Sequence, residues 1–230
     1  ARAGDRARSE TVARAAFAPV LACIDAFSER ALRPAPVQLA YVLATCALAR
    51  GDARDALATL EAAERRCLEP HPNLLFLAAS ARERLGETDA AERLYRACLA
   101  LDGRRFAIPV NPGFTAGAPR LRLASLALLR GDAGSALELL EGIGGALDLP
   151  ARLLRAEARL VRRDAANALR ELAPLLAGPA SIDPPPDLFA LAGWAAALSG
   201  SREPSLLDAA RRAPPERWIE PRRKSLLRAD

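Results

Sequence analysis

The side chains that could do chemistry in this chain are few: one histidine and four widely spaced cysteines, namely His71, Cys23, Cys46, Cys67 and Cys98. A structural zinc site needs closely spaced pairs of cysteine or histidine ligands, and the sequence contains no C-x-x-C pair. Each cysteine falls in a helical apolar pattern, where a free thiol behaves as a small core residue. We therefore expect no metal and no cofactor, and a reducing, cytoplasmic compartment.

The sequence also lacks the usual catalytic motifs. His71 lies between Pro70 and Pro72, with no nearby serine or cysteine in a turn that it could activate. The patterns G-x-x-x-x-G-K, G-x-S-x-G and H-E-x-x-H, which mark phosphate-binding loops, nucleophile elbows and zinc proteases, do not occur. Carboxylates such as Glu61 and Glu64 stand beside arginines at helical spacing, where surface ion pairing accounts for them. We expect no catalytic residue and no enzymatic activity in these 230 residues.

The composition favours helix. Ala, Leu and Arg dominate, hydrophobic residues make up 51% of the chain and aromatic residues 4%. No apolar run approaches the roughly 20 residues of a transmembrane helix, so we expect no transmembrane segment. The absence of methionine indicates a piece of a longer protein. The net charge of +5 comes from arginines that alternate with acidic residues, as on a solvated surface. Only the segment 211–228 is strongly basic, and its scarcity of aromatic residues disfavours nucleic-acid binding.

Five short turns resemble one another and recur about every 34 residues, a period typical of helical-hairpin repeats. Their central residues are spaced by 35, 45, 32 and 37 positions: Gly51, Gly86, Gly131, Arg163 and Gly200. Glycine suits such a turn because it adopts the left-handed conformation that ends a helix. An acidic residue follows four of the turns and can cap the next helix: Asp52, Glu87, Asp132 and Asp164.

Residues at fixed distances from each turn also agree in type. Seven positions before the turn stand the small residues Ala44, Ala79, Ala124, Ala156 and Gly193. Five positions after it stand Ala56, Ala91, Ala136, Ala168 and Ser205. Nine positions after it stand mostly large apolar residues, Leu60, Tyr95, Leu140, Leu172 and Ala209. Two closely packed helices need small side chains where their axes approach, so the pattern predicts a series of helical hairpins.

This arrangement resembles the tetratricopeptide repeat family over residues 37–213. The best unit runs from Pro72 to Asp102, PNLLFLAASARERLGETDAAERLYRACLALD. Its residues at the packing positions of the family are Leu75, Ala78, Ala79, Gly86, Ala91, Tyr95 and Cys98. The resemblance implies an all-α fold, a right-handed α-solenoid of about five helical hairpins with capping helices at both ends. The repeat identifies an architecture and not a function.

The turns also set the expected boundaries. A leading helix at 10–32, interrupted near Pro19, caps the array within residues 1–36, and a basic helix at 215–228 caps it within residues 214–230. The array is expected to consist of 37–70, 72–102, an insertion at 103–116, 117–148, 149–182 and 186–213. The expected helices are 37–50, 53–68, 73–85, 88–101, 118–130, 133–143, 150–162, 165–177, 186–199 and 203–213.

The insertion, GRRFAIPVNPGFTA, is rich in proline, glycine and apolar residues. Its prolines exclude helix, and its apolar side chains are too many for an idle loop. Two interpretations stay open: the insertion fills a gap in the array, or it contacts a partner.

A narrower resemblance concerns stretches such as PGFTAGAPRLRLASLALLRGD and PPPDLFALAGWAAAL. They are similar to the tetratricopeptide tails of bacterial glycosyltransferases of the family 2 type. This resemblance implies that the chain is the non-catalytic C-terminal part of such an enzyme, with the catalytic domain upstream.

The repeat resemblance implies a concave groove lined by the first helix of each hairpin, and hence a scaffold that binds a peptide or a partner protein. Helical projection gives the candidate partner-binding residues Gln38, Tyr41, Thr45, Asn73, Phe76, Ser80, Arg84, Leu121, Glu157 and Trp194, continued by Ser125, Leu153 and Ala190. Aromatic and arginine side chains are favoured as binding anchors. The aromatic residues could equally pack between helices, and a homodimerisation module is the alternative function.

Overall fold

The computed structural model describes residues 3–27, 34–66, 70–101, 108, 111, 114–177 and 186–200, and this part of the chain is all-α. Its one β feature within these ranges is an isolated bridge between Ile108 and Asn111. No helix in the described ranges is long and apolar enough to cross a bilayer. The predicted helices 203–213 and 215–228 and the basic segment 211–228 lie outside them. Contacts divide the chain into two compact units, residues 1–119 and 120–230.

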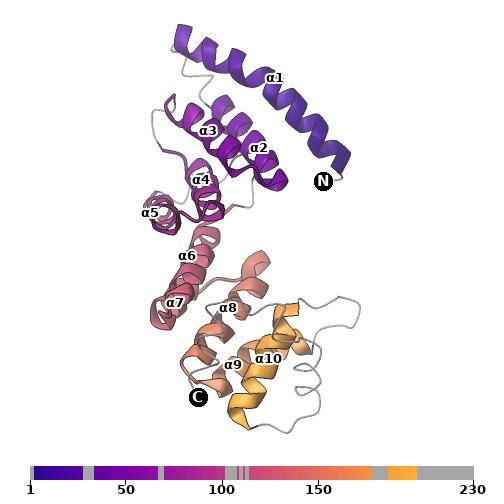
Figure 1. Cartoon of the computed structure of the whole chain (residues 1–230), viewed down its shortest axis with the longest axis vertical. Coiled ribbons are helices and arrows are strands. Elements are labelled where there is room, and N and C mark those ends of the chain that lie inside the picture. Colours follow the sequence, from indigo (N-terminus) through magenta and orange to yellow (C-terminus); the bar gives the residue numbers. More distant parts are fainter. Residues whose placement is uncertain are drawn as a thin grey trace. The chain divides into compact units, whose positions relative to one another are not determined.

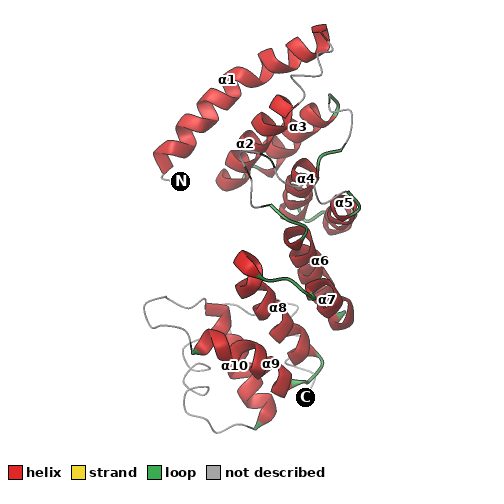
Figure 2. Cartoon of the chain, turned by 180° about the vertical axis from the view of Figure 1, so that it is seen from behind, coloured by secondary structure: helices red, strands yellow, loops and turns green. Residues whose placement is uncertain are grey.

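The first unit consists of one long helix followed by two helical hairpins (Figures 1 and 2). Helix α1 (Ala3–Phe27) packs on α2 (Pro34–Arg50), which pairs with α3 (Ala53–Glu64). Helix α4 (Pro72–Arg84) pairs with α5 (Thr88–Leu99) and contacts both α2 and α3. The first helices of the two hairpins, α2 and α4, therefore lie against each other.

The described part of the second unit contains two helical hairpins followed by one further helix. Helix α6 (Gly117–Leu129) begins at the end of the first unit and continues into the second, where it shares a core with α7 (Ala133–Leu140) and α8 (Asp148–Val161). A short 3-10 helix, η3 (Gly145–Leu147), precedes α8. Helix α8 pairs with α9 (Ala165–Leu176), and α10 (Pro186–Ser199) packs on both.

Proline marks the start of the first helix of each hairpin. Helices α2, α4 and α10 begin on proline, and α6 and α8 carry Pro119 and Pro150 at their third position. The N–H groups of a first helical turn have no partner within the helix, so proline loses nothing there and its fixed φ suits the helix. This is why α2 begins at Pro34, three residues earlier than the sequence predicted.

The left-handed turns predicted from the sequence are confirmed. All five central residues have positive φ: Gly51 (85°), Gly86 (79°), Gly131 (78°), Arg163 (58°) and Gly200 (65°). In four of the turns the next residue donates its N–H to the carbonyl five positions back, at 2.8–2.9 Å: Asp52 to Ala47, Glu87 to Arg82, Asp132 to Ala127 and Asp164 to Arg159. This bond satisfies a carbonyl that the end of the helix would otherwise leave free.

Three of the four predicted acidic caps are confirmed. Asp52, Asp132 and Asp164 each accept a hydrogen bond from the N–H three residues on, at 3.0, 3.0 and 3.2 Å. Hydrogen bonds from Ser135 and Asn167 hold the pKa values of Asp132 and Asp164 below their usual range. The prediction is wrong for Glu87, whose side chain makes no capping bond. Its longer side chain instead accepts from Arg82 Nη1 at 2.6 Å.

The residues predicted to lie at the closest approach of paired helices are buried. The eight alanines at these positions have an exposed fraction of 0%: Ala44, Ala56, Ala79, Ala91, Ala124, Ala136, Ala156 and Ala168. The large residues Leu60, Tyr95, Leu140 and Leu172 are exposed by 2% or less, and Gly193 is buried. Ser205 and Ala209 lie outside the described residues. The small residues give each hairpin its close packing, and the large ones fill its core.

The predicted break in the leading helix is wrong. Helix α1 is continuous from Ala3 to Phe27 through Pro19. Pro19 and Ala15, whose carbonyl loses its helical donor, both lie on the exposed side of α1, where water can satisfy that carbonyl. Phe17 packs against the core of the first hairpin. The other described helices lie within a few residues of their predicted bounds. Glycine turns and prolines account for the starts and ends of the first helices, whereas the second helices end one to four residues earlier than predicted.

Ion pairs join α1 to the first hairpin. Glu10 pairs with Arg14 at 3.1 Å and with Arg50, and Asp55 pairs with the same two arginines at 3.3 and 3.4 Å. Hydrogen bonds from Arg14 and Arg50 lower the pKa of Glu10. A carboxyl whose pKa is lowered on folding stabilises the fold above its unfolded pKa, and this contribution is lost as the pH falls through the folded pKa.

The turn geometry makes a prediction about two glycines of one hairpin. Gly131→Ala forces alanine into the left-handed region and should lower the free energy of unfolding by about 1 kcal/mol. Gly134→Ala, in the first turn of α7 with no positive φ, should leave it unchanged or raise it by up to about 1 kcal/mol. An added Cβ meets nothing within 4 Å at Gly131 and only an ordinary contact of 3.6 Å at Gly134. Urea unfolding measures both, and equal effects would contradict the prediction.

The ion pairs of α1 predict a pH dependence. The stabilisation from Glu10 should be complete above pH 4.5, the ordinary pKa of its carboxyl, and should be lost progressively at lower pH. Glu10→Gln should therefore lower stability at pH 6 and lose much less on acidification. Urea unfolding of the wild type, Glu10→Gln and the exposed control Glu64→Gln at pH 6 and pH 3 checks this. A parallel fall of wild type and Glu10→Gln would contradict it.

Candidate functional site

Six of the predicted partner-binding residues form a surface on α2 and α4, which we call the α2–α4 face: Gln38, Tyr41, Thr45, Phe76, Ser80 and Arg84. Their spacing of three or four residues places each set of three on one side of its helix, and the two helices contact each other. Thr45 and Arg84 are exposed and the other four are half-buried. The face thus combines exposed polar groups with partly accessible aromatic rings.

Aromatic packing supports the α4 half of this face. The ring centroid of Phe76 lies 5.0 Å from that of Phe114 and 5.6 Å from that of Tyr95, both tilted contacts. Ser80 Oγ donates to the carbonyl of Phe76 at 2.9 Å and lies 3.1 Å from the hydroxyl of Tyr95, which donates to Glu83 at 3.0 Å. Phe76 and Ser80 are therefore held in place from within the hairpin.

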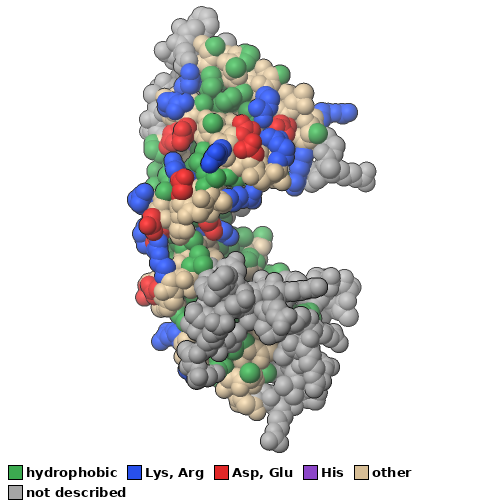
Figure 3. Space-filling model, in the orientation of Figure 1, with side chains coloured by type: hydrophobic (Ala, Val, Ile, Leu, Met, Phe, Trp, Pro, Cys, Tyr) green, Lys and Arg blue, Asp and Glu red, His purple; other side chains and the backbone are tan. Residues whose placement is uncertain are grey.

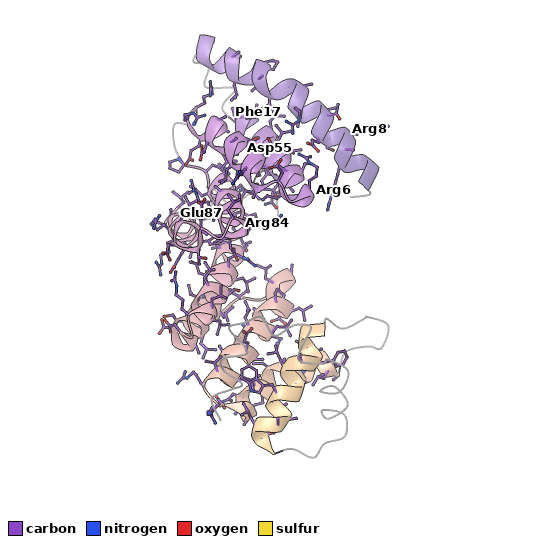
Figure 4. All side chains as sticks on the ribbon, viewed as in Figure 1. Arg6, Arg8, Phe17, Asp55, Arg84 and Glu87 are labelled. Atoms are coloured by element: carbon purple, nitrogen blue, oxygen red, sulfur yellow. The ribbon has the colours of Figure 1, made fainter. Side chains whose placement is uncertain are left out.

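The polar groups of the α2–α4 face differ in the hydrogen bonds and ion pairs that they make within the chain. Burial raises the pKa of Tyr41, and its hydrogen bond with Thr45 partly offsets this. Arg84 donates from Nη1 to the carbonyl of Leu48, which joins the ends of α4 and α2. Among the described residues no carboxylate pairs with Arg84, whereas Arg82 pairs with two. Arg84 (labelled in Figure 4) is therefore a cation held in place by one hydrogen bond, with further N–H groups that can donate to a partner.

Four residues predicted to line the groove are buried instead. Asn73 is 1% exposed, and its Oδ1 accepts from Asn111 Nδ2 at 2.9 Å. Leu121, Glu157 and Ala190 are also buried. The helical projection placed these four residues on the accessible side of their helices. In the structure neighbouring segments cover them.

In the second unit none of the predicted binding residues is exposed. Ser125, Leu153 and Trp194 are half-buried, and the last two pack against the core of α8, α9 and α10. Trp194 is thus partly packed and partly accessible, as Phe76 is, and its role in binding stays a prediction.

Helix α8 carries a group of arginines that was not predicted as functional. Arg155 and Arg159 pair with Glu171 of α9 at 3.1 and 3.4 Å, and Arg152 pairs with Asp148 at 2.7 Å. Their spacing along one helix was the available signal. Because carboxylates face all three, they hold α8 and α9 together and offer little charge to a partner.

The described part of the insertion packs into the first unit. Ile108 belongs to the core of the first hairpin. Phe114 is buried with Leu75 and Cys98, and Asn111 bonds to Asn73 as described above. For these residues the structure favours the interpretation that the insertion fills a gap in the array.

The side chains first considered for chemistry are engaged in packing and capping. Nδ1 of His71 accepts from the N–H of Asn73 at 3.2 Å, so His71 caps α4. Cys46 and Cys98 are buried free thiols whose pKa burial raises, for Cys98 to about 12. The side chains of Cys23 and Cys67 lie outside the description. No cluster of three metal-ligating side chains occurs among the described residues.

Charged side chains of both signs lie on the surface of the first unit. On the side shown in Figure 3, arginines and acidic side chains are intermixed over these helices. This matches the interleaving seen in the sequence and is typical of a solvated surface.

No protein-family model matches the chain, and no curated protein matches it in sequence. A solved structure does match. The chain is similar to BtubC (BKLC) from P. vanneervenii, with a TM-score of 0.59 and 20% sequence identity, over 95% of this chain and 92% of that one. At this identity the likeness concerns the fold, and it extends over nearly the full length of both chains.

The packing of the α2–α4 face predicts unequal effects of two substitutions. Phe76→Ala removes a half-buried ring from contacts with Tyr95 and Phe114 and should lower the free energy of unfolding by about 2–3 kcal/mol. Thr45→Ala changes an exposed position and should alter it by about 0.5 kcal/mol or less. Urea unfolding measures both. A Phe76→Ala protein as stable as the wild type would show that this ring is a surface residue.

Proposed function

We propose that the chain is a protein–protein interaction scaffold, a tetratricopeptide-like α-solenoid that binds a peptide segment of a partner protein on the α2–α4 face. Support for the repeat comes from the recurrence of the same hairpin: positive φ at all five turns and full burial of the eight alanines at matching positions. Repeats that stack through nearest-neighbour contacts present a continuous row of first helices, which such proteins use for binding.

The observation that carries the proposal is the combination of groups on the α2–α4 face. Arg84 is fixed by the carbonyl of Leu48 and has no carboxylate partner among the described residues. Tyr41 and Phe76 offer partly accessible rings whose positions are set by packing against the core. Rigid aromatic groups and arginine give contact energy at little cost in side-chain entropy.

The remaining predictions concern context. Three further statements stay predictions: the chain acts without catalysis in the cytoplasm, it forms the tail of a family 2-type glycosyltransferase, and it dimerises. Self-association would compete with the proposed function only if it covered Thr45 and Arg84. A sedimentation measurement on the wild type and on a Thr45→Arg variant separates self-association through this face from partner binding: only a dimer formed through the face would dissociate in the variant.

The proposal predicts that charge reversal on this face abolishes partner binding. Arg84→Glu should weaken capture of the partner from a lysate of the source cell by about tenfold or more, because it replaces a cation that pairs with no described carboxylate by an anion. Thr45→Arg, which blocks the face, should act similarly. Both positions are exposed, so circular dichroism should show unchanged helicity.

The matched control is Arg93→Glu, an exposed arginine on α5. Quantitative mass spectrometry of the captured proteins should find a protein retained by the wild type and by Arg93→Glu, and lost with the two variants of the face. Equal retention by all four proteins would remove the α2–α4 face as the binding surface.

A further inference from the structure

A second surface lies on the first unit, between α1 and α2. An open pocket of about 470 Å³ is lined by Arg8, Ser9, Val12 and Ala13 from α1 and by Leu39 and Val42 from α2. Its floor is apolar, and Arg8 is its one ionisable lining residue. We call it the α1–α2 pocket.

The exposure of Val12 distinguishes this pocket. Val12 is 64% exposed, whereas the other large apolar residues that stand out in the described ranges reach at most 42%, at Leu149. Leu39 and Val42 are half-buried and leave apolar surface open beside it. Covering an apolar side chain that adjoins other apolar surface is favourable, because it removes that surface from water.

The charges on the two flanks of α1 differ. On one flank Arg14 is neutralised by Glu10 and Asp55, which also pair with Arg50 of α2. On the pocket flank Arg8 is exposed and makes no ion pair with any described residue. Figure 4 shows Arg8 on the N-terminal half of α1. The pocket thus presents an uncompensated positive charge at the edge of an apolar floor.

Both walls of the pocket belong to helices that pack against each other. Ala13 and Leu21 are buried along α1, and α1 contacts α2. Ion pairs on the other flank join α1 to α2 and α3.

We propose that the α1–α2 pocket docks an acidic segment of a partner protein, which places one aliphatic side chain over Val12, Leu39 and Val42 and a carboxylate on Arg8. The apolar floor requires the aliphatic group, and the charge of Arg8 requires the carboxylate. A small polar ligand would need more converging polar groups than Arg8 and Ser9. A membrane surface or a nucleic acid would need several cations rather than one.

Binding of this segment would give α1 a second role besides the predicted one of capping the array. The pocket and the α2–α4 face border each other on α2, because Val42 follows Gln38 by four residues and precedes Thr45 by three. Variants of Val12 and Arg8 on α1 and of Arg84 on α4 distinguish the two surfaces, since these residues belong to one surface each.

The test selects random linear peptides displayed on phage against the whole chain. Selected peptides should share an aliphatic residue within one helical turn of Asp or Glu. A synthetic peptide with the consensus sequence should bind, and fluorescence anisotropy should show its affinity weakened about tenfold or more by Val12→Asp and by Arg8→Glu. Replacing the acidic residue of the peptide by lysine should restore binding to Arg8→Glu.

The controls match the variants in chemistry and exposure. Leu149→Asp introduces an acid at an exposed apolar residue of the second unit, and Arg54→Glu reverses an exposed arginine of α3. Both should bind the consensus peptide as the wild type does. Val12 and Arg8 are exposed, so their variants should keep the wild-type circular dichroism spectrum.

Three outcomes would overturn the proposal. The first is that selection yields no peptides with the aliphatic–acidic pattern, or that Val12→Asp and Arg8→Glu bind them as the wild type does. The second is binding that Arg84→Glu abolishes while Val12→Asp keeps it, which would support the α2–α4 face alone. The third is binding of the chain to phosphatidylserine vesicles that Arg8→Glu abolishes, which would identify the ligand as a lipid surface. Loss of peptide binding in Val12→Asp with normal binding in Arg84→Glu would support the pocket independently of the proposed function.

Discussion

Close packing of two helices around alanine is the interaction on which the structure depends. At the matching positions of the four fully described hairpins the side chain is a methyl group with no exposed surface. Any larger side chain there would separate the two helices of a hairpin and open the core that Leu60, Tyr95, Leu140 and Leu172 fill. The left-handed residue of each turn and the acidic cap that follows it in three hairpins bring the second helix back along the first.

Close packing around alanine also determines which side chains form the surface of the first unit. Because the buried sides of the helices are occupied by small residues and leucine, the longer side chains of the first unit are directed to its exterior. There several arginines meet carboxylates, as Arg14 and Arg82 do. Arg84 and Arg8 differ from them in that each lies beside accessible apolar groups and pairs with no carboxylate among the described residues. A scaffold recognises a partner through such unpaired groups, since a charge that is already paired within the chain gains less from a partner.

Much of the fold could be predicted from the sequence because its determinants are local. A glycine turn, a proline in the first turn and an alanine at a fixed offset each act within a few residues of their position. The misplaced features depend on which other groups a side chain meets in the folded chain, near or distant in sequence. Asn73 is buried by Asn111, 38 residues further on. Glu87 has Arg82 as a competing partner, and Pro19 is tolerated because its side of α1 faces water. The α1–α2 pocket needs two helices to be placed, which no pattern within either helix indicates.

The most direct test of the scaffold function is site-specific photo-crosslinking from the α2–α4 face. A photoreactive phenylalanine analogue replaces Thr45 in one protein and Arg93, on α5, in a second, and each is irradiated in the source cell. The account predicts that Thr45 crosslinks to a defined segment of one protein and that Arg93 does not. Crosslinks to that protein from Arg93 but not from Thr45, or none from either position, would contradict it.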